Sequence, residues 1–570
     1  MVLPRRLMVA VSFIQGLCLL LLYRALEADL WPAQEPIWLT TLLAFLIAVP
    51  AFILFTVERE NYRRLLICLG PYALLLVLIA AYTGLQMEPV EIVNVEALPA
   101  VFTLTIGIAS FKALMYTQEY LKNKSISYGS LLSNSWHNFL VMGFSLLFLL
   151  LFLGILFLWG AIFDLIGIGL FSYLFRQDWF LIPAGSVAFG IAVITFRNLV
   201  NIVESVSRLL KTLLKFLLPI LAVISVLFLA FLPFTGLETL WDTDYGSGLL
   251  LWLQALILFA VNAVYQTEKD ELPYPLDMHR FIYVAIALLP IYSILIFYGM
   301  SLRIAQYGLT VPRCWALIIA GLMALFAIGY LISIIKKRDT WLHGLAWVNI
   351  RMGLFVMILM VLVNTPLLNL QGISAQSQLN RHLSGNISFA ELDLNYLRWS
   401  LGRQGYLALE ELKTLYQESD PELVANIDFV LESNRFTPLP QSVAEIENRL
   451  VTWPDSRELP EVILVSMQSG RRWERLYALF VDLNNDGTEE ILTFFKQDGF
   501  EQMINGNIWV SEPVGWQAYP YSRSGVLSTE ILDELLIQGA ISQQANQWND
   551  LILGGAIIRI NLNENALLPL

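Results

Sequence analysis

Residues 139–159 read FLVMGFSLLFLLLFLGILFLW and contain no charged side chain. A helix needs about 20 predominantly apolar residues to cross the hydrocarbon layer of a membrane. This stretch of 21 residues meets that requirement without interruption. It therefore predicts a transmembrane helix, and the rest of the chain is interpreted outward from it.

Similar apolar windows recur before and after this stretch. The full set lies near residues 7–26, 37–57, 65–86, 97–117, 139–160, 180–196, 213–234, 247–266, 281–300, 314–335 and 350–370. The weakest are 97–117, which Lys112 interrupts, and 180–196, which is short and contains Pro183 and Gly185. We expect a polytopic α-helical membrane protein of about eleven spans, with ten and twelve as alternatives.

The composition agrees with a membrane protein. The chain of 570 residues is 57% hydrophobic and 14% charged, whereas soluble proteins carry about 25% charged residues. Residues 1–374 hold 22 Lys and Arg against 20 Asp and Glu, a net charge of +2, and the remainder holds 13 against 27, a net charge of -14. A near-neutral membrane domain therefore precedes an acidic, water-soluble tail. No strongly basic face is apparent, which argues against a nucleic-acid partner bound through its phosphates.

The loop charges predict the orientation, because cytoplasmic loops are enriched in Lys and Arg. With the N-terminus placed in the cytoplasm, the inside segments carry 17 positive charges and the outside segments carry four: Arg24, Arg176, Arg303 and Arg313. An odd number of spans then puts the tail across the membrane. We predict a multi-pass protein of a bacterial inner membrane, with a cytoplasmic N-terminus and a periplasmic C-terminal domain.

One basic segment permits two interpretations. Residues 197–215 read RNLVNIVESVSRLLKTLLK and space their apolar side chains at intervals of three and four. The segment is either an amphipathic helix lying on the cytoplasmic leaflet or a cytoplasmic extension of the seventh span.

The tail divides into two predicted parts. We expect a transmembrane helical domain over residues 1–374, a helical subdomain over 375–455 and a strand-rich α+β subdomain over 456–570. A capping box at Ser388 and Glu391, and Asp420 followed by Pro421, predict helix starts. The predicted strands are EVILVSM (461–467), RLYALFVDL (475–483), EEILTFF (489–495), NIWVSE (507–512) and LILGGAIIRINL (551–562), with a helix over 529–541.

A candidate calcium loop lies between two of these strands. In DLNNDGTEE, residues 482–490, oxygen-bearing side chains alternate around a glycine. Asp482, Asn484, Asp486, Thr488 through its carbonyl, and Glu490 occupy positions 1, 3, 5, 7 and 9 of a calcium loop. The bidentate glutamate of an EF-hand is missing, because Thr493 stands at position 12. The alternative is an ordinary hairpin turn with acidic residues facing water.

A second candidate site lies on the predicted outer side. The stretch SLRIAQYGLTVPRCW, residues 301–315, contains Arg303, Tyr307 and Arg313. Two arginines against the charge trend need partners, which we expect to be lipid phosphates, an anionic ligand or carboxylates of the acidic tail. The alternative is interfacial anchoring combined with a tight helix hairpin.

Two motifs carry a resemblance to a known family. YGLTVPR at 307–313 and ISAQSQLNRHLSGNISFAELDLNYLRWSLGRQGYLALEEL at 373–412 resemble the bacterial membrane proteins grouped as domain of unknown function 4153. The resemblance implies a polytopic inner-membrane protein over most of the chain and lends no catalytic residues.

Three functions remain open at this point. The first is a membrane-anchored periplasmic binding or sensing protein, with the bilayer and an envelope protein as partners. The second is a transporter or channel with a periplasmic cap, and the third is a lipid- or glycan-handling enzyme. The sequence contains no GxSxG, HExxH or phosphate-binding glycine loop, so we favour a protein that is not an enzyme. Calcium is the one cofactor predicted.

Overall fold

The fold was derived from a computed structural model of the chain. It describes residues 3–93, 97–123, 126–236, 246–265, 272–337, 341–433, 443–454, 457–468, 475–496, 504–512, 515–524, 541–544, 550–553 and 556–559. These residues form two compact units, residues 1–411 and residues 412–570, which are described separately. The predicted helix over 529–541 lies outside the described residues except for Ile541.

Within the described ranges, eleven helical segments are long and apolar enough to cross a membrane. They are α1 (Arg5–Glu27), α2 (Pro36–Thr56), α3 (Tyr62–Leu85), α4 (Ala97–Asn123), α5 (Tyr128–Leu165), α7 (Asp178–Asn198), α8 (Val200–Thr235), α10 (Gly246–Val264), the pair α11 (Leu276–Ala287) and α12 (Leu289–Tyr307), α13 (Val311–Lys337) and α14 (Leu342–Leu362). A short helix, α6 (Leu170–Phe175), lies between α5 and α7. The predicted number of spans is confirmed.

Two of these helices differ in detail from the windows in the sequence. The ninth span consists of two helices, since one residue, Leu288, separates α11 from α12 and Pro290 lies in the first turn of α12. The eighth helix, α8, runs without a break from Val200 to Thr235. The basic segment 197–215 therefore belongs mainly to the helix that contains the seventh span, as the second interpretation expected.

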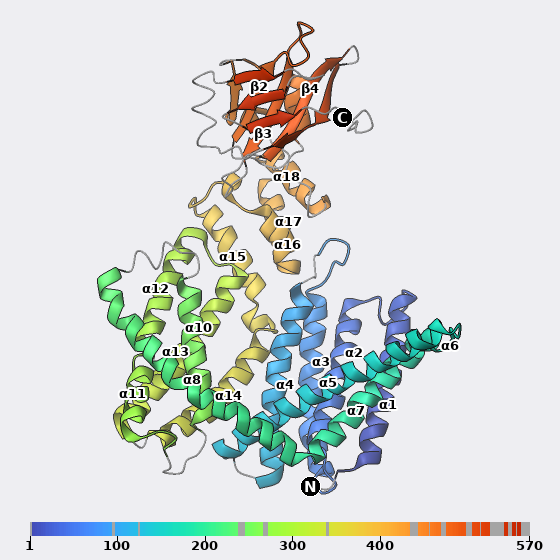
Figure 1. The fold of residues 1–570 in the computed structure, drawn as a ribbon, viewed down its shortest axis with the longest axis vertical. Helices are drawn as coiled ribbons and strands as arrows, with labels where there is room; N and C mark the ends of the chain where they lie inside the picture. Colours follow the sequence, from blue (N-terminus) through green and yellow to red (C-terminus); the bar gives the residue numbers. More distant parts are fainter. Residues whose placement is uncertain are drawn as a thin grey trace. The chain divides into compact units, whose positions relative to one another are not determined.

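The membrane helices form two groups. The first helix group, α1 to α7, packs mainly through contacts of α1 with α7, α2 with α3 and α5 with α7. The second helix group, α8 to α14, packs through α8 with α10 and through α13 with α12 and α14. In Figure 1 the first group is coloured blue to cyan and the second mainly green. Helix α4 contacts α14, and α5 contacts α8, so these pairs join the groups.

Further helices follow the last span. The first unit continues through α15 (Leu370–Leu383) and α16 (Leu394–Ser400) into α17 (Gly402–Tyr416), and α18 (Pro421–Glu432) lies in the second unit. The capping box of Ser388 and Glu391 is present. The Asp420 carboxylate accepts a hydrogen bond from the Leu423 N–H at the start of α18. The predicted helix start at Asp420 is confirmed. The capping box at Ser388 begins only the 3-10 turn Phe389–Glu391, and α16 is capped by Asp393, whose carboxylate accepts a hydrogen bond from the Tyr396 N–H. The predicted division at residues 374 and 455 stays a prediction.

The second unit has two sheets. The five-stranded sheet has the order β1 (Leu450–Trp453), β2 (Arg475–Val481), β3 (Glu490–Lys496), β4 (Ile504–Glu512) and β5 (Gly515–Pro520), with β1 parallel to β2 and the other pairs antiparallel. The four-stranded sheet has the order β6 (Ser522–Ser524), β9 (Ala556–Arg559), β8 (Asp550–Leu553) and β7 (Ile541–Gln544). Strand β2 is buried on both faces. The chain is thus a polytopic helical membrane protein with a C-terminal α+β domain.

Two predicted strands are wrong. Residues 551–562, predicted as one strand, contain β9 and most of β8, which pair with each other antiparallel. Residues 461–467 belong to helix α20 (Glu461–Gln468), which follows the short helix α19 (Val443–Glu447) in the chain. Ile463 and Leu464 are buried, whereas Val462 and Val465 are exposed. Adjacent buried residues fit a helix face and not the alternation of a strand. Packing of this face against β2 and β3 outweighs the strand preference of the β-branched side chains.

Candidate functional site

A cavity lies among five membrane helices. We call it the membrane cavity. Its volume is about 410 Å³, within the 300–1,000 Å³ usual for small-molecule sites. Seventeen described residues line it: Phe111, Lys112, Met115, Tyr116, Tyr128, Leu131, Leu132, Ser135, Trp136, Phe139, Phe259, Asn262, Ala263, Phe326, Asn349, Gly353 and Val356. Helices α4 and α5 of the first group and α10, α13 and α14 of the second provide them. The cavity therefore lies between the two helix groups.

A network of amides and phenols joins Tyr128 of the first group to Asn262, Tyr330 and Asn349 of the second. The side-chain oxygen of Asn262 accepts hydrogen bonds from the Tyr128 hydroxyl at 3.1 Å and from the Asn349 amide at 2.6 Å. The Tyr330 hydroxyl lies 3.1 Å from that oxygen and 2.5 Å from the side-chain oxygen of Asn349. Polar groups in a membrane are costly unless they are hydrogen-bonded. The network thus stabilises a polar wall where lipid could not solvate it.

The joint between α4 and α14 has a close contact. The Tyr116 hydroxyl donates a hydrogen bond of 2.6 Å to the Ile350 carbonyl. A Cβ at Gly353 would collide with that hydroxyl, so only glycine lets α14 approach α4 so closely. Both residues line the membrane cavity, and the same contact therefore sets its width.

Lys112 provides the charge in this cavity. It lies on α4, and within the described chain its ammonium group forms no hydrogen bond or ion pair. Sequence reasoning treated Lys112 only as an interruption of a span. An ionisable residue inside a membrane helix is itself a signal of a functional site. The network residues Asn262, Tyr330 and Asn349 lie on three other helices, and no spacing in the sequence connects them with Lys112.

The loop between α12 and α13 contains the second predicted site. The Arg313 guanidinium donates a hydrogen bond of 3.0 Å to the Gly308 carbonyl and lies over the Tyr307 ring at 5.2 Å. Gly308 has φ of 72° and ψ of -178°, a conformation that glycine adopts almost alone. A Cβ there would lie 2.8 Å from Cδ of Arg381. Gly308 therefore permits both the turn and the approach of α15.

Helices α15 and α16 contact this loop through polar side chains. Arg381 donates to the Gln306 carbonyl at 2.6 Å, and Gln378 donates to the Tyr307 and Leu309 carbonyls. The Tyr396 hydroxyl accepts from the Val311 N–H. These bonds connect the two motifs that carried the family resemblance. Arg313 meets a carbonyl here and not a carboxylate, and the expected interface role of Arg303, Tyr307 and Arg313 stays a prediction.

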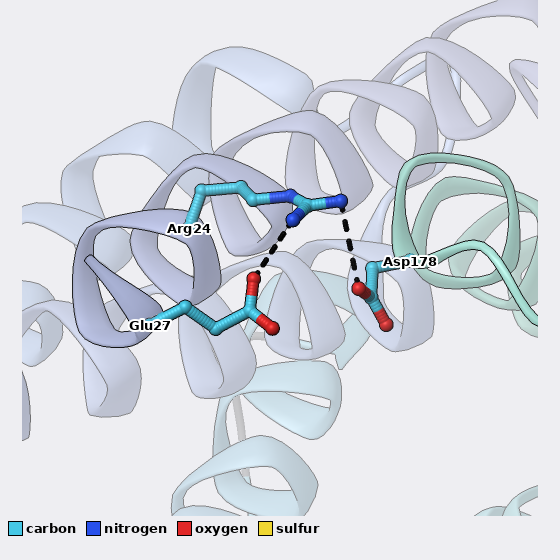
Figure 2. A network of polar contacts seen from close by, with 3 residues as sticks. All are labelled: Arg24, Glu27 and Asp178. Carbon is cyan, nitrogen blue, oxygen red and sulfur yellow. Dashed lines mark hydrogen bonds and ion pairs between the residues drawn. The ribbon is translucent and has the colours of Figure 1, made fainter.

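Arg24, another of the four arginines predicted to lie outside, has carboxylate partners. Arg24, in the last turn of α1, lies 2.8 Å from the Glu27 carboxylate and 3.5 Å from that of Asp178 at the start of α7 (Figure 2). All three side chains are partly exposed, so the network adds little stability. It does neutralise one of the four positive charges that the topology prediction places outside.

The candidate calcium loop forms the turn between β2 and β3. Both Asp482 carboxylate oxygens accept backbone N–H bonds, from Asp486 at 3.2 Å and from Gly487 at 3.0 Å. Asp486 accepts from the Thr488 N–H and hydroxyl, which hold the pKa of its carboxyl below the usual value. In the described chain, no group of three His, Cys, Asp or Glu side chains is arranged to hold a metal ion.

Glu490 differs from the other residues of this loop. It is buried, and its carboxylate accepts a 2.7 Å hydrogen bond from the Leu483 N–H. Burial is the main cause that raises its pKa above the usual value. The structure brings Asp482, Asn484 and Asp486 together in a self-bonded turn, with Glu490 bonded at its base. Calcium binding by these residues and Thr488 stays a prediction.

One of three comparisons with known proteins, that with family models, gives a match. No curated protein and no solved structure matches it. Residues 9–412 match the family model described as a domain of unknown function, DUF4153. The match includes all eleven membrane segments except the first residues of α1, and it ends in α17. The membrane cavity and the contacts between the α12–α13 loop and α15 all lie inside it. The chain therefore belongs to the DUF4153 family, an uncharacterised family of membrane proteins with many apolar helices.

Proposed function

We propose that this protein is a membrane transporter or carrier that binds a small molecule in the membrane cavity. The observation that carries the proposal is a cavity of about 410 Å³ between two helix groups, lined mostly by apolar side chains and containing Lys112 with a few hydroxyl and amide groups. Binding sites of transporters commonly lie between two bundles that move against each other. Helices α4 and α14 form the joint about which such movement would occur.

The cavity also ranks the three functions that the sequence left open. A solid bundle would favour a membrane-anchored binding or sensing protein, whereas a cavity among the membrane helices that contains a lysine and amide groups favours transport. A lipid-handling enzyme required a cleft lined by Arg303 and Arg313. The groove of about 540 Å³ along α15 is lined instead by Arg381 with Ile373, Gln376, Ser377, Asn380, Ser384 and Asn386. We therefore rank transport first and keep binding or sensing as a role of the C-terminal domain.

We further propose that the N-terminus is cytoplasmic and that the C-terminal domain is periplasmic, in a bacterial inner membrane. The proposal is supported by the odd number of spans and by the excess of positive charge in the predicted inside segments. A periplasmic position would let the acidic domain meet an envelope protein or calcium.

Water access to the cavity tests the transport proposal. Val356 lines the cavity, whereas the neighbouring Phe355 is 43% exposed on the outer surface of the helices. In full-length protein with Cys18, Cys68 and Cys314 replaced by serine, Val356→Cys should react with a membrane-impermeant maleimide in native vesicles. The matched control Phe355→Cys should not react, since lipid excludes the reagent and disfavours the thiolate. An unreactive Val356→Cys in vesicles of both orientations would contradict a water-filled cavity and favour the binding or sensing role.

Reporter fusions test the orientation separately. Alkaline phosphatase, which is active only outside the cytoplasm, should be active when fused after Leu570 and inactive when fused within residues 336–349. The reverse pattern would overturn the proposed topology and leave the cavity proposal unaffected.

A further inference from the structure

The depth of Lys112 is the starting point. Lys112 precedes the end of α4 at Asn123 by eleven residues, which corresponds to about 16 Å along a helix. A hydrocarbon layer is about 30 Å thick and the 27 residues of α4 span about 40 Å, so Lys112 lies within the apolar part of the span, nearer to the end that carries Gln118 and Glu119. A lysine at such depth costs free energy unless it has a partner or water. Lys112 lines the membrane cavity, and no hydrogen bond or ion pair within the described chain offsets this cost.

The charge balance of the cavity points to an anion. Lys112 is the one charged side chain among the described residues that line it. A second ammonium group, that of Lys211 on α8, lies 5.8 Å from the ring centre of Trp136, another lining residue. Glu204 lies near enough to Lys211 to offset its charge, so Lys112 is the positive charge of the cavity wall, beside hydroxyl and amide groups. A bound carboxylate or phosphate would be paired with Lys112 in surroundings where charge-assisted hydrogen bonds are strong.

The remaining wall points to an apolar chain. Most lining residues are apolar or aromatic, including Phe111, Met115 and Phe326. Phe139 on α5 and Phe259 on α10 also line the cavity, yet their side chains are 61% and 55% exposed. These two rings therefore belong both to the cavity wall and to the surface that faces lipid. A ligand with a hydrocarbon chain could extend between α5 and α10 into the bilayer.

We propose that the membrane cavity binds a single-chain amphiphile with one anionic headgroup, which Lys112 recognises through an ion pair. The inference rests on the proposed function and names its substrate class. The headgroup oxygens meet the Lys112 ammonium and the hydroxyl and amide groups of Ser135 and Asn349. The chain lies along the aromatic residues toward the opening between Phe139 and Phe259. The alternative is that Lys112 only extends toward the aqueous end of the cavity.

Binding to full-length protein in lipid nanodiscs tests the proposal. The probes are oleate, which has a carboxylate, lysophosphatidylglycerol, which has an anionic phosphate, and the zwitterionic lysophosphatidylcholine. Displacement of a fluorescent fatty acid reports their affinities. The wild type should prefer at least one anionic probe, and the stronger of the two identifies the headgroup chemistry. Equal binding of all three probes would overturn the proposal.

Substitutions assign the preference to Lys112. Lys112→Gln should weaken binding of the preferred anion roughly 10- to 100-fold and leave the zwitterion unchanged, because only a charge-assisted bond is lost. Lys112→Arg should retain the preference. The control Lys122→Gln lies in the exposed last turn of the same helix and should change nothing. Undiminished anion binding by a folded Lys112→Gln protein, with unchanged helix content and elution, would overturn the assignment.

A cavity-filling variant separates this inference from the proposed function. Ala263 is buried in the cavity wall, and Ala263→Phe should abolish binding of every probe. Loss of binding in Ala263→Phe with no effect of Lys112→Gln would overturn the anion assignment while the cavity remained the binding site. Unaffected binding in Ala263→Phe would overturn both the anion assignment and the membrane cavity as the binding site.

Discussion

Lys112 in the membrane cavity forms no hydrogen bond or ion pair within the described chain, whereas the acidic residues of the β2–β3 turn are bonded to their own backbone. Asp482 and Asp486 accept four bonds from N–H and hydroxyl groups of the next six residues. Even without these bonds, water would solvate the carboxylates of such a turn. The hydrocarbon of a membrane cannot solvate an unpaired ammonium group in this way.

The difference shows where a polar residue indicates function. In an aqueous domain, local hydrogen bonds satisfy the turn, and they explain its residues without a ligand. Among membrane helices, the amides around Asn262 are satisfied by partners on other helices, but the charge of Lys112 is not balanced. The same residue types therefore carry different information in the two regions. The following predictions test this contrast in order of decreasing effect.

The largest effect is expected in the cavity wall. Asn262→Leu removes the acceptor of the Tyr128 hydroxyl and of the Asn349 amide. Each unsatisfied group costs about 1–3 kcal/mol, although single bonds between membrane helices average about 0.6 kcal/mol. We expect a loss of about 3 kcal/mol, measured as a lower unfolding temperature of the purified protein. Asn198→Leu removes only a bond to the Ile194 carbonyl of its own helix and should cost much less. Equal losses would show that the network has no special role.

The second effect concerns the joint between the helix groups. Gly353→Ala places a methyl group against the Tyr116 hydroxyl and should cost about 2 kcal/mol through overpacking. Gly321, on α13, has nothing within 4 Å of the position of a Cβ. Gly321→Ala should therefore be neutral or stabilise the protein by up to about 1 kcal/mol, through the higher helix propensity of alanine. Thermal unfolding compares the two variants, and a tolerated Gly353→Ala would argue against a close joint.

The third effect tests whether the β2–β3 turn is more than a turn. If Asp482, Asn484, Asp486, Thr488 and Glu490 bind calcium with a dissociation constant of about 10⁻⁴ to 10⁻³ M, then 1 mM calcium should stabilise β2 and β3 by about 0.4–1.4 kcal/mol. Hydrogen exchange of the β2 and β3 amides in the full-length protein, with calcium and with a chelator, measures this. Equal protection, or an undiminished effect in Asp482→Asn plus Asp486→Asn, would leave an ordinary hairpin turn.

The smallest effect concerns the pH dependence of the same turn. Since burial raises the pKa of Glu490 above 4.5, the folded state binds its proton more tightly than the unfolded state. Stability from this group is therefore present below pH 4.5 and is lost as the pH rises through the raised value. Glu490→Gln keeps an acceptor for the Leu483 N–H but cannot titrate. The fall in hydrogen-exchange protection of the β2 and β3 amides with rising pH should therefore be smaller in this variant. The control is Glu489→Gln, at an exposed residue that is paired with Arg457. This variant should show the same pH-dependent fall in protection as the wild type.

Local composition was sufficient to predict much of the fold. Each membrane window satisfies its backbone by helical hydrogen bonds within its own segment, so the number of spans and the family motifs could be recognised without tertiary information. The start of the helix at Asp420 was predictable for the same reason. The strand preference of residues 461–467 misled, because packing of Ile463 and Leu464 against the sheet decides their structure.

The sequence by itself determined the membrane class, the count of spans, the charge asymmetry and the turn at 482–490, since all of these depend on neighbouring residues. Only the tertiary structure decided the membrane cavity. Lys112, Asn262, Tyr330 and Asn349 come from α4, α10, α13 and α14, and their proximity depends on which helices pack together. Helix packing is set by contacts such as that of Gly353 with Tyr116. Gly353 and Tyr116 are more than 200 positions apart in the chain, and no local pattern relates them.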